Sequence, residues 1–210
     1  MRLLTVGDSF TYGEELVDPQ VSAWPYLIGK KLSYDVINLA KPGSGNSRMV
    51  RHAVEQINNY DMIIIAWSHF DRTELADENG VYDLWPGCSI NPHKEYSPWR
   101  SEVIDYYTKH YNDQYLYNQY LIYIILIQQY LKLNNKKYLM LDAFGNNNYR
   151  KNNGISTQID SKYYIGWPNE TMMEWTYGTP QGPGGHFLEQ GHAIVADKIN
   201  EYIRHLSWVS

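Results

Sequence analysis

Short runs rich in β-branched and other apolar residues alternate along this chain with longer segments of helical periodicity, and this alternation restricts the fold more than any other feature. The β-rich runs are Leu3–Val6, Asp35–Leu39, Met62–Ala66 and Tyr138–Leu141, and polar or glycine-containing residues follow each of them. Strands that are separated by helices are typical of βαβ units, in which the strands run parallel. The sequence therefore predicts an α/β fold with a parallel sheet.

The segments between and after these runs have helical features. Helical periodicity covers Ala23–Leu32, Met49–Ile57, about Trp99–Leu133 and Leu188–Leu206. The third of these segments predicts one long helix or two. Two stretches rich in Asn, Gly and Pro, one between the third β run and the long helical segment and one leading up to Gly185, predict irregular excursions. Excursions of this length inside a domain often form walls or lids of a functional site.

The size and charge of the chain limit what it can be. A chain of 210 residues is near the upper size that one hydrophobic core supports, so we expect a single domain over residues 1–210. The net charge of −5 offers no basic surface for phosphates, which argues against a nucleic-acid partner. The single cysteine, Cys88, excludes an intrachain disulfide and a thiolate metal cluster, and we expect it to be structural.

No segment has the length and apolarity of a signal peptide or of a membrane span. The longest apolar run, Leu121–Ile127, is well short of the roughly 20 residues that a bilayer-spanning helix needs. We therefore expect synthesis in the cytoplasm and no membrane partner. The oligomeric state cannot be deduced from these patterns.

The residues that follow the predicted strands are the first candidates for a functional site, because sites in parallel α/β sheets form at the carboxyl ends of the strands. These residues are Gly7-Asp8-Ser9, Gly43-Ser44-Gly45-Asn46, Ser68-His69 and Asp142. Gly7 allows a sharp turn that would expose the hydroxyl of Ser9, as a serine nucleophile requires. The alternative is that Asp8 and Ser9 only cap a turn or a short helix.

His186 is the candidate base for such a serine. It follows the segment Gly182-Pro183-Gly184-Gly185, just ahead of the last helix, and is placed to reach across the strand ends. A serine hydroxyl is a weak nucleophile, and histidine is the usual base because its pKa lies near neutrality. His192 lies instead on the apolar stripe of the last helix, so we expect it to be a buried packing residue.

Other motif classes are absent from the sequence. It contains no Gly-x-x-x-x-Gly-Lys-[Ser/Thr] phosphate loop and no Gly-x-Gly-x-x-Gly dinucleotide turn, and His186 and His192 do not have the His-Glu-x-x-His spacing of zinc sites. The sequence therefore predicts neither a metal nor an organic cofactor.

Three segments resemble the motifs of the SGNH (GDSL-type) hydrolases. They are Gly7-Asp8-Ser9-Phe10, Asn38 with Gly43, and His186-Phe187-Leu188-Glu189-Gln190-Gly191-His192. The resemblance extends from residue 3 to about residue 206 and implies a three-layer, flavodoxin-like domain. It also implies that Ser9 is the nucleophile, that His186 is the base, and that the N–H groups of Ser9 and Gly43 bind the oxyanion.

The acid of the family's catalytic triad is missing from its usual place. The family carries an Asp three residues before the catalytic histidine, and that position is Pro183 in this chain. Asp142 and Glu174 are the candidate acids from other loops. A backbone carbonyl or a water molecule is the third possibility.

The family's third motif, Gly-x-Asn-Asp, is also altered. The segment 66–74 lacks the oxyanion-hole Asn, which Ser68 or the side-chain amide of Asn46 would replace, although Asn46 would also make a good helix N-cap. We expect Arg72 and Glu74 to form a structural ion pair, with binding of a polar substrate group as the alternative. This third motif most resembles SGNH proteins encoded by bacterial viruses, which implies possible association with a virion.

These features predict a serine esterase or acyl hydrolase. Ser9 would attack the carbonyl carbon of an ester, and His186 would take its proton, in a dyad or triad that forms an acyl-enzyme. The expected substrate is a small-molecule or glycan acyl ester, for example an O-acetylated glycan. The alternative is a binding or structural protein whose site has decayed. The two altered motifs favour this alternative, and the retention of both Ser9 and His186 argues against it.

Overall fold

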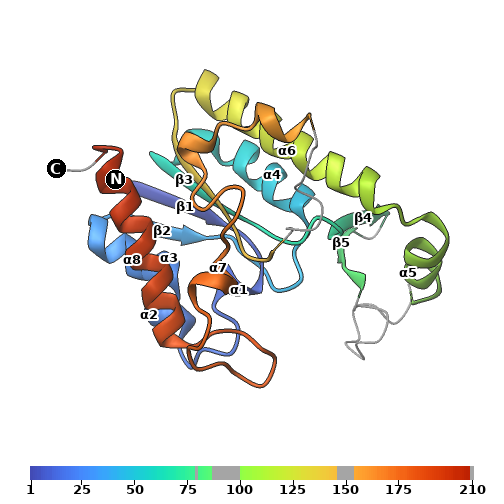
Figure 1. The fold of residues 1–210 in the computed structure, drawn as a ribbon, viewed down its shortest axis with the longest axis horizontal. Coiled ribbons are helices and arrows are strands. Elements are labelled where there is room, and N and C mark those ends of the chain that lie inside the picture. The colour runs from blue at the N-terminus through green and yellow to red at the C-terminus, as the bar shows by residue number, and fades with distance from the viewer. Residues whose placement is uncertain (79, 87–99, 146–153, 209–210) are drawn as a thin grey trace.

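A parallel sheet forms the centre of the molecule. The computed structural model describes residues 1–78, 80–86, 100–145 and 154–208. In these residues the sheet has four strands, β1 (Arg2–Val6), β2 (Asp35–Asn38), β3 (Met62–Trp67) and β6 (Lys137–Asp142), in the order β2-β1-β3-β6 (Figure 1). All the neighbouring strands in it are parallel. The predicted α/β class is confirmed, and each predicted run matches a strand to within one residue at either end.

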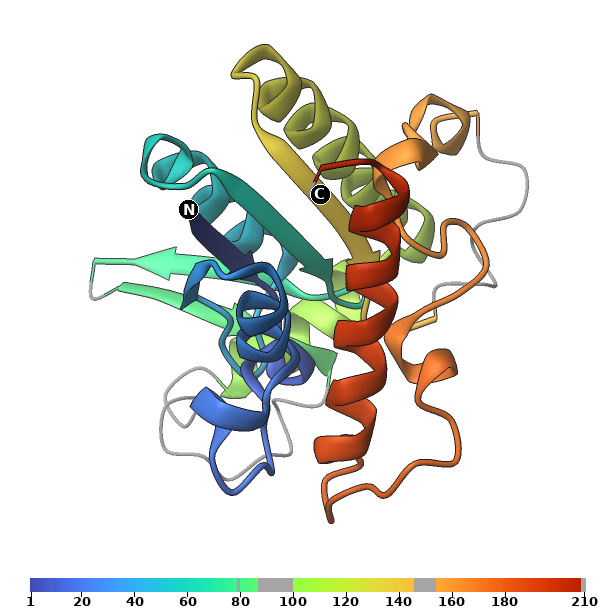
Figure 2. The same cartoon turned by 90° about the vertical axis from the view of Figure 1, so that its left-hand side faces the viewer.

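Helices cover both faces of this sheet. α3 (Trp24–Leu32) and α8 (Glu189–His205) pack together on one face, and α4 (Asn46–Glu55) and α6 (Asp113–Leu133) cover the other (Figures 1 and 2). The three-layer arrangement is therefore as predicted. The remaining described helical elements are α1 (Ser9–Tyr12), α2 (Pro19–Ser22), α5 (Arg100–Asp105), α7 (Met172–Trp175), a π-helical turn at Tyr106–His110, and 3-10 turns at Ile57–Asn59, Ser156–Gln158 and Ser161–Tyr163. The segment from about Trp99 to Leu133 thus contains two α-helices.

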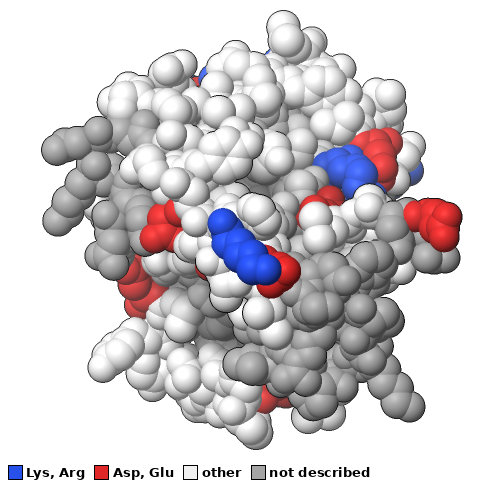
Figure 3. Space-filling model, turned by 90° about the vertical axis from the view of Figure 1, so that its right-hand side faces the viewer, with Lys and Arg blue, Asp and Glu red and all other residues white. Residues whose placement is uncertain are grey.

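The first predicted excursion contains an antiparallel hairpin. β4 (Thr73–Asp77) pairs with β5 (Gly80–Leu84), so the expectation of irregular structure is wrong for these residues. Cys88 lies outside the described residues. On the side of the molecule drawn in Figure 3, most described side chains are uncharged, and basic groups lie beside acidic ones. No helix in the described ranges is both long enough and apolar enough to cross a membrane.

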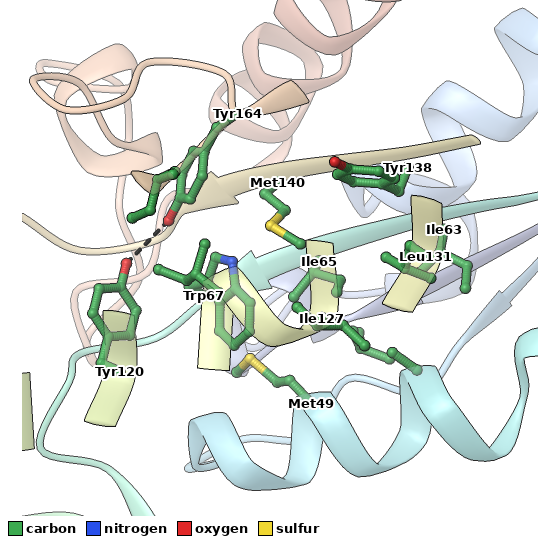
Figure 4. Packing of buried hydrophobic residues seen from close by; sticks show 14 of the residues in the cluster. Met49, Ile63, Ile65, Trp67, Tyr120, Ile127, Leu131, Tyr138, Met140 and Tyr164 are labelled. Atoms are coloured by element: carbon green, nitrogen blue, oxygen red, sulfur yellow. Dashed lines mark hydrogen bonds between the residues drawn. The ribbon is translucent and has the colours of Figure 1, made fainter. Parts of the chain in front are cut away.

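Alternate residues of the strands enter two hydrophobic clusters, one on each face of the sheet. In β3 the odd-numbered residues from Ile63 to Trp67 pack against α4 and α6, and the even-numbered residues from Met62 to Ala66 pack against α3 and α8. Figure 4 shows the cluster under α4 and α6. Because both faces are covered, every residue of β3 is buried, as its continuous apolar sequence requires. This burial holds the carboxyl ends of the strands in place. The candidate site is formed by the residues that follow these ends.

Candidate active site

Ser9 follows β1 in a turn that Asp8 holds in place. Asp8 is the N-cap of α1: its Oδ1 accepts a hydrogen bond from the N–H of Phe10 at 3.1 Å, and its Oδ2 accepts one from the hydroxyl of Ser68 at 2.7 Å. Burial raises the pKa of Asp8, although Arg72, 3.7 Å from Oδ2, acts to lower it. The capping interpretation is therefore right for Asp8. It leaves Ser9 as the first residue of the helix, and at 4% exposed this residue is largely buried, not exposed as expected.

The loop after β2 lies against this turn and has its own conformational requirements. The N–H of Lys41 donates to the carbonyl of Gly7 at 3.2 Å, which joins the two segments. Gly43 has a φ of +78°, and a Cβ on it would lie 2.6 Å from the indole of Trp85 at the end of β5. Glycine is thus needed at position 43 for both its backbone conformation and its contact.

Two backbone N–H groups in these segments have no acceptor among the described residues. Within the described residues, the N–H groups of Ser9 and Gly43 make no hydrogen bond to a protein acceptor. For Ser9 this is expected, because the first N–H groups of a helix have no partner inside it. Both groups predicted to bind the oxyanion are therefore unoccupied by the protein's own acceptors.

The side chain of Asn46 does not fit the predicted oxyanion role. Its Nδ2 donates to the carbonyl of His69 at 3.0 Å, and its Oδ1 accepts from the N–H of Ser68 at 3.0 Å. The amide thereby holds the loop after β3 and is not free to donate to an oxyanion. Its N-cap interpretation is wrong as well, because the N-cap of α4 is Gly45. The Ser68 hydroxyl is likewise used, since it donates to Asp8.

His186 lies in a loop that closes on itself and packs against the Ser9 segment. The N–H of Gly182 donates to the carbonyl of His186 at 2.9 Å, and the imidazole lies 4.8 Å from the ring of Phe10 between centroids. Its Nε2 is 3.4 Å from Oε2 of Glu14. Within the described residues, no hydrogen bond joins Nε2 to Oγ of Ser9. Catalytic hydrogen bonds often tighten only when substrate binds.

Glu15 is the carboxylate at Nδ1 of His186. Its Oε2 lies 2.9 Å from Nδ1 and accepts from the N–H of His186 at 3.1 Å, and its Oε1 accepts from the N–H of Gly184 at 2.6 Å. The hydrogen bond from Gly184, followed by those from His186, lowers the pKa of Glu15 below its usual value. Glu15 is not among the acids predicted from the sequence.

Asp142 is not the acid that orients His186. Its buried carboxylate accepts hydrogen bonds from the hydroxyl of Tyr164 at 2.6 Å and from that of Tyr120, the two tyrosines that Figure 4 shows joined to each other. The pleat of β6 explains the difference. Asp142 points to the same side as Met140, toward α6, whereas the His186 loop precedes α8 on the opposite face.

Glu174, the other candidate acid, is not the carboxylate found at Nδ1 of His186. It is exposed on α7, and the acceptor at Nδ1 of His186 is Glu15. One signal in the sequence could have indicated Glu15. The pair Glu14-Glu15 follows the nucleophile motif within a few residues, so a carboxylate was available on the same segment as Ser9.

Arg72 and Glu74 have different partners from the ones expected. Glu74 forms its ion pair with Arg51 at 2.8 Å. The guanidinium of Arg72 lies 4.8 Å above the ring of Phe144 and near Asp8, at the edge of the Ser9 turn. The expected pairing between Arg72 and Glu74 is therefore wrong.

His192 is a buried packing residue, as predicted. It is 1% exposed, its Nδ1 accepts from the N–H of Trp24 at 3.2 Å, and its ring packs edge-on against Phe187. Burial, with a smaller effect from the charge of His186, lowers the pKa of His192 to about 3. The imidazole is therefore neutral at physiological pH.

The site as a whole is suited to proton transfer. In the described parts of the chain, no three His, Cys, Asp or Glu side chains are grouped so that they could hold a metal ion. Oε2 of Glu15 can accept from Nδ1 of His186 when that nitrogen carries the proton, and the neutral imidazole then has its lone pair at Nε2. Such a nitrogen can take a proton from a nearby hydroxyl.

Comparison with known sequences gives one match. A family model described as a family of unknown function, DUF6071, matches residues 14–210, a span that contains Glu15 and His186 and begins after Ser9. No curated protein matches the sequence.

Comparison with solved structures finds similar folds, and several of these proteins are described as esterases. TesA has a TM-score of 0.53 at 12% identity, with 98% of this chain and 99% of that chain covered. The esterase EstA from Pseudoalteromonas sp. has a TM-score of 0.54 at 14% identity, with 99% of each chain covered. An acetyl xylan esterase from Butyrivibrio proteoclasticus has a TM-score of 0.51 at 17% identity, with 99% of this chain and 65% of that chain covered. At these identities the likeness shows the fold alone, and it agrees with the predicted α/β fold with a parallel sheet.

Proposed function

The chain belongs to DUF6071, a family of unknown function, and from the geometry of its own site we propose that it is a serine-dependent hydrolase of acyl esters. The observation that carries this proposal is the contact between the Ser9 segment and the candidate base. Phe10, Glu14 and Glu15 all contact the imidazole of His186. The structural likeness to esterases supports the same class of reaction at the level of the fold.

The proposed reaction has two halves. In the first, Oγ of Ser9 bonds to the ester carbonyl carbon while its proton passes to Nε2 of His186, and the N–H groups of Ser9 and Gly43 donate to the oxyanion. The carbon–oxygen bond to the alcohol then breaks, and the alcohol takes the proton from Nε2. In the second half, water attacks the acyl-enzyme with His186 again as base, which releases the acid and restores Ser9.

The proposed substrate is an acyl ester of a small molecule or of a glycan, with an O-acetyl group as the first choice to test. One structural neighbour is described as an acetyl xylan esterase, which supports the inclusion of acetylated carbohydrates. The resemblance of the third motif to viral SGNH proteins favours a glycan in the same way. We also propose that residues 1–210 form a single domain.

Covalent labelling tests whether Ser9 is activated. A fluorophosphonate probe reacts with serines whose hydroxyl is activated by a base, so it should label the peptide that contains Ser9 and no other. Ser9→Ala should abolish the label. Ser161→Ala, which changes an exposed serine of the 3-10 turn at residues 161–163, should retain it.

The kinetics of variants test whether Ser9 and His186 act as a unit. Hydrolysis of an aryl acetate should fall by at least about 10³-fold in Ser9→Ala, in His186→Ala and in the double variant, with nearly equal losses in all three. His205→Ala, a histidine exposed on α8, should retain activity. Additive losses would contradict the pairing. A folded protein with neither turnover nor label would favour the decayed binding protein.

A further inference from the structure

We propose that Glu15 is the positioning carboxylate of His186 and takes the place of the missing acid at Pro183. The inference rests on the proposed function, because it assigns a role within the same site. In this arrangement the nucleophile and the carboxylate come from one segment, residues 9–15, and the base comes from the loop before α8.

The contacts of Glu15 fix both the main chain and the ring of the base. One carboxylate oxygen, Oε2, accepts from the N–H of His186 and lies 2.9 Å from its Nδ1, and the other, Oε1, accepts from the N–H of Gly184. The carboxylate therefore holds the imidazole at one end and the backbone that carries it at the other. A water molecule or a single backbone carbonyl could not make this set of contacts.

Two glycines of the loop lie so close to this carboxylate that a side chain at either position would contact it. A Cβ on Gly182 would lie 2.6 Å from Cδ of Glu15, and a Cβ on Gly184 would lie 3.0 Å from its Oε2. Glu15 itself has a φ of +70°, which is uncommon for a residue with a side chain and recurs where a function demands it. The glycine-rich sequence before His186 thus has a physical reason, which is the close approach of Glu15.

Acceptance at Nδ1 determines which nitrogen of His186 is basic. A carboxylate can only accept, and Glu15 lies closer to Nδ1, at 2.9 Å, than Glu14 lies to Nε2, at 3.4 Å. The neutral ring therefore carries its proton on Nδ1 and leaves the lone pair of Nε2 for the hydroxyl of Ser9. The same negative charge stabilises the imidazolium that forms when His186 takes that proton.

Glu14 offers a matched control. It has the same charge, belongs to the same segment and lies near the same imidazole, but its carboxylate is 3.4 Å from the other nitrogen, Nε2. It is also more exposed, at 42% of its side chain against 18% for Glu15. Replacing each glutamate by glutamine therefore separates an effect at Nδ1 from a general loss of negative charge.

The direct test is the tautomer of His186, which does not depend on activity. The ¹⁵N resonances of the seven histidine rings are recorded at a pH where the ring is neutral, and His186→Asn assigns those of His186. The wild type and Glu14→Gln should carry the proton on Nδ1. Glu15→Gln should shift the proton toward Nε2, because the neutral amide holds a proton on Nδ1 less strongly than the carboxylate does. With its oxygen kept at the N–H of Gly184, the amide also turns an N–H toward Nδ1 and gives up the hydrogen bond from the N–H of His186.

Turnover gives the second readout. Glu15→Gln should lower kcat for an aryl acetate by up to about 10⁴-fold with little change in KM. Glu15→Asp, which keeps an acceptor in a shorter side chain, should keep the Nδ1 tautomer and recover part of the loss, and it serves if Glu15→Gln does not fold. Glu201→Gln, exposed on α8, should behave as the wild type.

The outcomes separate the two proposals. An active wild type whose tautomer and kcat are both unchanged in Glu15→Gln would overturn the role of Glu15 and leave the hydrolase proposal standing. An inactive wild type in which Glu15→Gln still moves the proton would overturn the hydrolase proposal and support the positioning of His186 by Glu15. Loss of the Nδ1 tautomer in Glu14→Gln as well would also count against a specific role for Glu15.

Discussion

Two histidines six residues apart have opposite surroundings in this molecule. His186 lies between two carboxylates, one at each ring nitrogen. His192 is enclosed by apolar groups, accepts a backbone hydrogen bond from Trp24, and has a pKa lowered to about 3. The surroundings of His192 therefore keep its ring neutral near neutral pH.

This difference predicts how stability changes with pH. The unfolded chain protonates His192 near pH 6.5 and the folded chain only near 3, so the unfolded state binds more protons between these values. Stability should therefore fall as the pH drops through that window, by about 2 kcal/mol between pH 7 and pH 5. His192→Gln keeps an acceptor for Trp24 and should lose this part of the pH dependence. Urea unfolding at both pH values measures it.

The exposed His205 on the same helix supplies the control for that experiment. His205→Gln should retain the full pH dependence of the wild type. If His192→Gln instead shows the wild-type difference between pH 7 and pH 5, the buried imidazole is not its source.

At the scale of elements, the β4–β5 hairpin supports the loop that follows β2. Asp83 of β5 is 2% exposed, accepts from the N–H of Gly45 at 3.0 Å, and forms an ion pair with Lys41 at 3.3 Å. Trp85, just after β5, packs on Gly43. The hairpin therefore holds the segment that presents one of the two proposed oxyanion N–H groups.

Removal of the Asp83 side chain should weaken this support. Asp83→Ala leaves the buried N–H of Gly45 without an acceptor, so it should lower the free energy of unfolding by about 1–3 kcal/mol and reduce turnover as the loop loosens. Asp83→Asn keeps an acceptor oxygen and loses only the ion pair with the half-exposed Lys41, so it should lose less of both. Urea unfolding and aryl acetate kinetics measure the two effects. Equal losses in both variants would contradict the role of the Gly45 hydrogen bond.

The alternation of side chains along β6 directs Asp142 away from His186. We therefore expect a variant of Asp142 to lose stability more than activity. Because its carboxylate accepts hydrogen bonds from Tyr120 and Tyr164 on the α6 side of the sheet, Asp142→Asn should lower the melting temperature. Its kcat should fall far less than that of Glu15→Gln. A larger loss of kcat in Asp142→Asn would show that this carboxylate, and not Glu15, assists His186.

The strands could be predicted from the sequence because their physical cause is local. A strand such as β3, buried on both faces, must be apolar along its whole length, and that pattern is visible without any partner. Ser9 and His186 were found through motifs with a fixed local form. The hairpin was missed although the sequence contains Asn79-Gly80, a pair typical of tight hairpins, and β5 begins at Gly80. Glu15 was missed because its contact with residue 186 is long-range and no periodicity encodes it.

At the scale of the whole molecule, segments from both halves of the sequence share one cluster. Leu3 of β1 and Trp24 of α3 pack in the same hydrophobic cluster as Val195 and Ile199 of α8. We therefore expect one cooperative unfolding transition, with equal calorimetric and van't Hoff enthalpies. Differential scanning calorimetry measures both. Two separable transitions would contradict the single domain proposed for residues 1–210.

The contact between Glu15 and the His186 loop also bears on when the protein becomes active during its synthesis. The ribosome makes Ser9 and Glu15 early and His186 late, so a nascent chain holds a nucleophile with no base for most of translation. Only when the glycine loop has emerged and folded back onto Glu15 can the proposed reaction begin. Under the proposed mechanism, a chain released before His186 is made therefore lacks its base and should not hydrolyse acyl esters.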